Sequence, residues 1–195
     1  ANGKNGTAAD FRGLKRDLYE GGVRVPGVMV WPAKISTAKK VDLPCITSDY
    51  LPTVIDALDI DHPEDYELDG RSLMPIIEGN LDKRDSQIGL MYSGRIAWHK
   101  EQYKLLSYDG GKAYQLYDLV TDPSETKDLA AEKPEMVEQL KKEMMTWHDS
   151  VKESFEGEEY GTESLERSEA KWSSPLTAKA AKKKKSKKNK KKGNK

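Results

Sequence analysis

The residues best placed to do chemistry lie in one short segment, Arg12–Pro26, which gathers charged side chains around two adjacent glycines. Lys15 precedes Tyr19 by three intervening residues, and Tyr19 opens the run Tyr-Glu-Gly-Gly-Val-Arg-Val-Pro. Lys15 offers an ammonium with three hydrogen-bond donors. The glycine pair Gly21–Gly22 permits a turn that other residues resist. The glycines therefore predict a bend in a segment that carries four basic side chains.

The neighbouring charges support this interpretation. We expect Glu20 and Arg24 to pair and to hold the loop that positions Lys15, without a catalytic role of their own. An exposed loop lysine with no function is the plainer alternative for Lys15.

Other chemical motifs are missing from the sequence. It has no G-x-S-x-G, no P-loop and no dinucleotide fingerprint. The single cysteine, Cys45, predicts a small buried hydrophobe, with a reactive thiol as the alternative. The three histidines have no ligand spacing, and we expect them to be structural or solvated; they are His62, His99 and His148.

The charge is unevenly distributed along the chain. The 195 residues carry 33 basic and 33 acidic side chains, but residues 179–195 contain eleven lysines and no acid. The remainder has 22 basic and 33 acidic residues, a net charge of −11, which excludes a globally basic nucleic-acid-binding fold. No apolar run is long enough for a membrane span. The polar composition of 156–195 predicts disorder.

Four kinds of element should position the segment. The apolar run 27–32 predicts a strand buried on both faces, whose sheet neighbours lie outside this chain. Residues 48–60 predict a helix capped by Ser48 or Asp49, and 72–79 a short helix. The expected apolar face of the helix over 48–60 consists of Leu51, Val54, Ile55 and Leu58. Short aromatic and aliphatic runs over 87–119 predict an antiparallel meander.

A long amphipathic helix is expected after Pro134. Its apolar residues recur at helical spacing and should pack on the meander; they are Met136, Leu140, Met144, Trp147 and Val151. We expect this stripe to be core, and a partner-binding groove is the alternative.

The segment Arg12–Pro26 resembles a signature of the type I, formylglycine-dependent sulfatases (the arylsulfatase family), in which a lysine precedes Tyr-Glu-Gly-Gly-x-Arg-Val-Pro at this spacing. Three further stretches resemble that family in the same order. Ser48–Thr53 is similar to its Asp-x-x-Pro-Thr helix start, and Leu68–Leu73 to its Asp-Gly-x-Ser-Leu turn. Leu116–Thr126 is similar to its Leu-Tyr-Asp-Leu…Asp-Pro-x-Glu close. The resemblance covers about residues 11–155.

The resemblance implies part of an alkaline-phosphatase-like α/β fold, with the last part of the main parallel sheet and a C-terminal α+β subdomain. It implies hydrolysis of sulfate esters, such as aryl sulfates or sulfated glycans, by a formylglycine nucleophile and usually Ca²⁺. Lys15 would then be the catalytic and substrate-binding residue that contacts the sulfate oxygens. Fixed cations suit the negative charge that spreads over those oxygens. A periplasmic or secreted location is also suggested by the family.

Two departures from the family pattern shape the domain assignment. Neither Cys45 nor Ser173 begins the Cys/Ser-x-Pro-x-Arg motif from which formylglycine is made, and the paired metal aspartates are missing. We therefore expect no metal ligands here and a C-terminal fragment that is inactive alone. We assign 1–85 to the catalytic domain, 86–155 to the C-terminal subdomain and 156–195 to a Lys-rich tail.

The alternative function is a polyanion-binding protein that acts through residues 179–195. Eleven positive charges attract nucleic acid, anionic lipid or sulfated polysaccharide through counterion release. The tail lacks aromatic residues for base stacking, so such binding would be nonspecific. A solvated, solubilising tail is the plainer interpretation.

Overall fold

The computed structural model describes residues 8–63, 68–81, 83–84 and 86–157, within two compact units. The sheet unit combines residues 1–24 with 89–195, and the helical unit comprises residues 25–88. The disorder predicted for 156–195 falls, apart from residues 156 and 157, outside the described residues.

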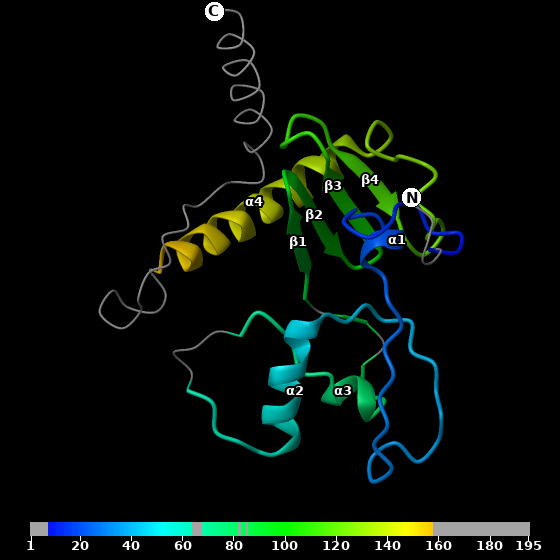
Figure 1. The fold of residues 1–195 in the computed structure, drawn as a ribbon, viewed down its shortest axis with the longest axis vertical. Coiled ribbons are helices and arrows are strands. Elements are labelled where there is room, and N and C mark those ends of the chain that lie inside the picture. The colour runs from blue at the N-terminus through cyan, green and yellow to red at the C-terminus, as the bar shows by residue number, and fades with distance from the viewer. Residues whose placement is uncertain (1–7, 64–67, 82, 85, 158–195) are drawn as a thin grey trace, which may run out of the picture. The chain divides into compact units, whose positions relative to one another are not determined.

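The sheet unit is built around four strands in the order β1-β2-β3-β4 (Figure 1). They are β1 Ile88–Tyr92, β2 Arg95–Lys100, β3 Tyr103–Ser107 and β4 Gln115–Asp118. The pairs β2–β3 and β3–β4 are antiparallel. Between β1 and β2, Ser93 and Gly94 have φ values of 48° and 83°, as the favoured two-residue hairpin turn requires. The predicted meander is therefore confirmed.

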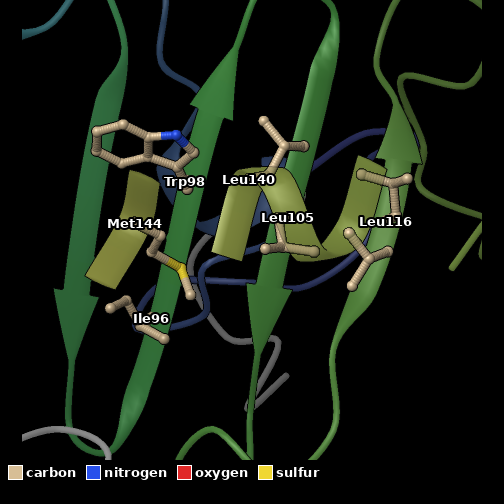
Figure 2. Packing of buried hydrophobic residues seen from close by; sticks show 7 residues of the cluster. Ile96, Trp98, Leu105, Leu116, Leu140 and Met144 are labelled. Atoms are coloured by element: carbon tan, nitrogen blue, oxygen red, sulfur yellow. The ribbon is translucent and has the colours of Figure 1, made fainter. Parts of the chain in front are cut away.

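One face of the sheet packs on helix α4, Pro134–Glu156. Side chains alternate between the faces of a strand, so Ile96, Trp98, Leu105 and Leu116 point the same way. Figure 2 shows these side chains meeting Leu140 and Met144 of α4. Val137 completes the buried set, and Met136 and Trp147 pack at its edge. Four of the five residues predicted for this stripe are therefore confirmed as core or as packed on it, whereas Val151 is half-buried and lies outside this cluster.

The opposite face of the sheet is covered by the segment that contains Lys15. Leu18 and Tyr19 are buried against Ala97, Leu106 and Tyr117. Directly after them comes α1, Glu20–Val23, a single helical turn. The sheet is therefore buried on both faces, and its second face is the platform for the candidate loop.

The helical unit is formed from short elements. The 3-10 helix Thr47–Asp49 leads into α2, Tyr50–Ala57, and α3 spans Met74–Ile77. The helix predicted over 72–79 is confirmed, and Gly79 follows it with φ 81°. A small cluster of Leu73, Met74 and Ile77 packs with Trp31 and Ile35.

The structure differs from what the sequence predicts for the helical unit in the described residues. The apolar run 27–32 forms no strand there, and Val28 is 90% exposed. A strand needs a hydrogen-bonded neighbour, and no described segment pairs with this one. The apolar face predicted for α2 is also uncovered, because Leu51, Val54 and Leu58 are exposed.

The caps predicted for α2 are not formed either. Neither Ser48 nor Asp49 makes a side-chain cap of this helix. Asp49 instead accepts hydrogen bonds from the backbone N–H groups of Ile46 and Arg71 and from the guanidinium of Arg84. Its carboxylate therefore joins three segments of the unit.

Across the described part of the chain, no helix is both long and apolar enough to cross a lipid bilayer. The longest, α4, carries charged residues on the face that it turns away from the sheet.

Candidate functional site

Lys15 lies at the tip of a tight turn on the outer side of the sheet unit. Its side chain is exposed and forms no hydrogen bond or ion pair with any described residue. Two residues of left-handed backbone flank the tip, Gly13 with φ 82° and Arg16 with φ 83°. Among the described residues, none therefore pairs with the ammonium of Lys15.

The turn is closed by Asp17. The Asp17 N–H donates to Leu14 O at 2.7 Å, and Asp17 Oδ2 accepts from the Leu14 N–H at 3.0 Å. These two bonds join the residue before Lys15 to the residue two positions after it. The backbone that carries Lys15 is therefore fixed at both ends.

Two side chains of the sheet attach this turn to its platform. Arg95 Nη1 donates to Arg16 O at 2.6 Å and lies 2.8 Å from Asp17 Oδ1. The hydroxyl of Tyr108 accepts from the N–H groups of Leu18 at 2.7 Å and Tyr19 at 3.2 Å. Burial raises the pKa of Tyr108 to about 12 despite these two hydrogen bonds, so its phenol stays neutral.

The glycine pair is required by close packing of the backbone. A Cβ atom at Gly21 would stand 2.5 Å from Gly13 O and 2.6 Å from Arg12 O. At Gly22 it would collide with Asp17 O and stand 2.6 Å from Leu14 O. The glycines thus let α1 pass directly beneath the turn.

A buried group of three charges lies below α1. Lys104 of β3, 1% exposed, places Nζ 2.9 Å from Glu20 Oε1 and 3.0 Å from Glu125 Oε1. Glu20 is 8% exposed and Glu125 is fully buried. The predicted partner of Glu20, Arg24, lies 3.7 Å from Glu20 Oε2. The expected pair is therefore present, but Lys104 is the nearer and more buried cation.

Arg12 ties the start of the segment to the same group. Its guanidinium stacks 4.0 Å from the centroid of the Tyr19 ring. Its Nη1 donates to the hydroxyl of Tyr117 at 2.9 Å and to Glu125 O at 3.0 Å. Burial raises the pKa of Tyr117 to about 12 despite the nearby Arg12 charge. This phenol is neutral and accepts the guanidinium N–H.

Sequence reasoning missed most of this support. Lys104, Tyr108, Tyr117 and Arg95 join the segment across long stretches of chain. Tyr117 and Glu125 did carry a signal, because both stand in the Leu116–Thr126 stretch of the family resemblance, although that resemblance assigned neither a role.

Metal ligands do not assemble within the described chain. No group of three or more His, Cys, Asp or Glu residues there could hold a metal ion. The described residues therefore do not fit a calcium site. Cys45 is exposed, so its predicted burial is wrong; it lies in an irregular loop instead of a core.

Comparisons with known proteins identify the family of this chain. Residues 14–150 match the family model described as N-sulphoglucosamine sulphohydrolase, C-terminal. The chain is 36% identical to human steryl-sulfatase over 103 residues, which is 51% of this chain and 17% of that protein. It is 28% identical over 145 residues to N-acetylgalactosamine-6-O-sulfatase of Bacteroides thetaiotaomicron, covering 67% of this chain and 28% of that protein.

Solved structures give the same result. One, described under the metabolism of multiple glycosaminoglycans by Bacteroides thetaiotaomicron, has a TM-score of 0.63 at 26% identity, over 70% of this chain and 32% of its own. Another, i-CgsB in complex with a neocarrahexaose, has a TM-score of 0.60 at 25% identity, over 66% and 30%. The expected class, part of an alkaline-phosphatase-like α/β fold, is confirmed.

The fold and the matches define the class as the C-terminal part of a sulfatase. The chain belongs to the N-sulphoglucosamine sulphohydrolase C-terminal family. It spans about a sixth of steryl-sulfatase and under a third of the longer bacterial matches.

Proposed function

We propose that the chain is the C-terminal portion of an enzyme that hydrolyses sulfate esters, and that Lys15 binds the sulfate group. The observation that carries this proposal is an exposed lysine without a described partner, on a turn fixed by Asp17, Arg95 and Tyr108. The family match gives that lysine its chemical context.

The chemistry follows from charge. Sulfuryl transfer spreads negative charge over the non-bridging oxygens, and a cation held in place beforehand stabilises that charge without reorganising. The ammonium of Lys15 supplies three donors to such an oxygen cluster. Because Leu14 and Asp17 close the turn, little freedom of the backbone is lost when the anion binds.

The remaining machinery is assigned to other parts of the whole enzyme. The described residues hold neither a metal cluster nor a formylglycine motif, and we derive no step through either group. Ca²⁺ and the formylglycine nucleophile, which the family resemblance implies, would be supplied from outside these residues. The substrate would be an aryl sulfate or a sulfated glycan, as the names of the relatives suggest.

A comparison of two proteins tests this proposal. Sulfate release from 4-nitrophenyl sulfate and from sulfated disaccharides is measured for the whole protein and for these 195 residues alone. We expect release by the whole protein and none by the isolated chain. Turnover by the isolated chain, or no sulfate release by the whole protein from any of these esters, would contradict the proposal.

A further inference from the structure

Glu125 is an unusual residue for a turn. It has a left-handed backbone with φ 55° and is fully buried. For a residue other than glycine such a conformation costs about 1–3 kcal/mol and tends to occur at functional sites. Burial also raises the pKa of its carboxyl group, against the opposing effect of the Lys104 charge. The surrounding contacts must offset both costs.

Glu125 contacts residues that precede and residues that follow Lys15 in the sequence. After Lys15, the N–H of Glu20, the first residue of α1, donates to Glu125 Oε2 at 2.6 Å. Before Lys15, the guanidinium of Arg12 donates through Nη1 to the Glu125 carbonyl at 3.0 Å. One residue therefore fixes the chain three positions before Lys15 and five positions after it.

The turn that carries Glu125 is itself anchored to the sheet. The Asp122 N–H donates to Asp118 O, at the end of β4, at 2.8 Å. Asp122 Oδ2 accepts from the N–H groups of Thr126 at 2.7 Å and Lys127 at 2.8 Å. The Glu125 N–H donates to Asp122 O at 3.1 Å. Hydrogen bonds of Asp122 to residues before and after it thus fix the turn in which Glu125 has its left-handed backbone.

Lys104 completes the connection. Its ammonium lies between Glu20 Oε1 and Glu125 Oε1, at 2.9 and 3.0 Å. Removing one member of such a buried group leaves an uncompensated charge. Consequently α1, β3 and the turn at Glu125 are locked to one another.

We propose that Glu125 is a positioning residue that fixes the placement of Lys15 for sulfate binding. The inference rests on the proposed function. Glu125 itself does not touch the substrate and acts only through the loop that it holds from both sides. Because a displacement of about 1 Å costs on the order of 100-fold in rate, loss of this contact lowers turnover although Lys15 is still present.

A double-mutant cycle in the whole enzyme tests this inference. Glu125→Gln keeps the shape of the side chain but turns an amide toward Lys104, and we expect roughly a 10- to 100-fold loss of kcat/KM. In a Lys15→Ala background the same change should cost less than about twofold, because residues acting as one unit are non-additive. Glu132→Gln, a surface glutamate paired with Lys127, is the matched control and should stay within about twofold of the parent in both backgrounds.

The location of the loss separates positioning from general damage. The contact of Lys15 with sulfate strengthens as charge develops, so the loss should appear in kcat while KM changes by less than about threefold. Equal losses from Glu125→Gln with and without Lys15 would overturn the inference. An unchanged kcat/KM in Lys15→Ala alone would instead overturn the proposed function.

A second variant covers a failure to fold. If Glu125→Gln shows no cooperative thermal unfolding, the same cycle is run with Arg12→Gln, which removes the bond to Glu125 O from the surface of the unit. A loss of at least about fivefold that disappears in the Lys15→Ala background supports the inference. A loss that persists there contradicts it.

Discussion

At the scale of single residues, the position of Lys15 depends on hydrogen bonds and packing of neighbouring residues. Its turn is closed by Asp17, attached by Arg95 and Tyr108, and underlain by two glycines. The lysine side chain itself forms no hydrogen bond or ion pair with a described residue. The residues around Lys15 therefore fix the backbone from which its ammonium projects.

The glycine pair gives the sharpest test of that geometry. Gly22→Ala should destabilise the protein by about 3 kcal/mol, because the new methyl group meets Asp17 O and Leu14 O in fixed backbone. Gly27→Ala is the matched control, since no atom lies within 4 Å of its Cβ position. Urea unfolding of both variants measures the difference. Equal stability of the two would show that the close approach is not real.

A second prediction concerns the hydroxyl of Tyr108. Tyr108→Phe leaves the N–H groups of Leu18 and Tyr19 without their acceptor and should cost about 1–3 kcal/mol at pH 7. Tyr50→Phe, at an exposed position, is the control. The pKa of Tyr108 is raised to about 12 in the folded protein, above about 10 in the unfolded chain. Its contribution to stability is therefore complete below pH 10 and is lost as the pH rises through 12.

Chemical denaturation between pH 7 and pH 12 measures this effect. The stability gap between Tyr108→Phe and the parent should narrow as the pH rises above 10. A gap that stays constant to pH 12 would contradict the assigned role of the phenol.

Local patterns revealed Lys15 but not its support. The spacing of Lys15 to the glycines is written in one short stretch of sequence, so it could be predicted. Lys104 and Glu20 are separated by 84 positions, and Arg12 and Glu125 by 113. Contacts of that kind arise from the fold of the sheet, and no local pattern contains them.

At the scale of elements, prediction succeeded where an element finds its partner within this chain. The stripe of α4 and the alternation of the strands meet in one core, so periodicity was sufficient. The strand expected over 27–32, with its sheet neighbours placed outside this chain, does not form among the described residues, and the apolar face of α2 has no covering partner among them. Val28 and Leu51 are exposed for that reason.

The helical unit is stabilised by the buried carboxylate of Asp49, which joins three of its segments. Burial tends to raise the pKa of this carboxyl group, but hydrogen bonds from Arg84, Arg71 and Ile46 outweigh it and hold the pKa below its usual value. The carboxylate therefore stabilises the unit fully above about pH 4, its unfolded value, and this stability is lost as the pH falls through the lower folded value.

Replacement of Asp49 tests how much its hydrogen bonds stabilise the helical unit. Asp49→Asn should destabilise the helical unit by about 3–5 kcal/mol at pH 7, because it leaves the guanidinium of Arg84 buried without its counter-charge. The deficit should shrink below pH 4. Hydrogen exchange of the amides of α2 measures it, with Asp42→Asn, an exposed surface pair, as control. A deficit independent of pH would contradict the account.

At the scale of the whole molecule, the chain spans only part of the length of the relatives that it matches. It spans 17% of steryl-sulfatase and 32% of a bacterial structural relative. Most of its exposed large apolar side chains, among them Val30 and Val54, belong to the helical unit, while Tyr92, Val120 and Phe155 are exposed in the sheet unit. The sheet unit, by contrast, buries both faces of its sheet within the described chain.

Residues 179–195 give a prediction that separates the two functions considered. Their eleven lysines should retain the protein on heparin through counterion release. Deleting them should move elution to lower salt while leaving sulfate release by the whole enzyme within about twofold, because ester hydrolysis is assigned to the Lys15 region. Unchanged elution would rule out the tail as the polyanion contact.

The central claim is that Lys15, and not the general positive charge of its loop, binds sulfate. Lys15→Ala and Arg16→Ala remove one charge each from adjacent exposed positions, and kcat/KM for sulfate-ester hydrolysis is measured for both in the whole enzyme. We predict a loss of about 100- to 1,000-fold for Lys15→Ala and less than about threefold for Arg16→Ala. Equal losses, or an unchanged kcat/KM in Lys15→Ala, would contradict the claim.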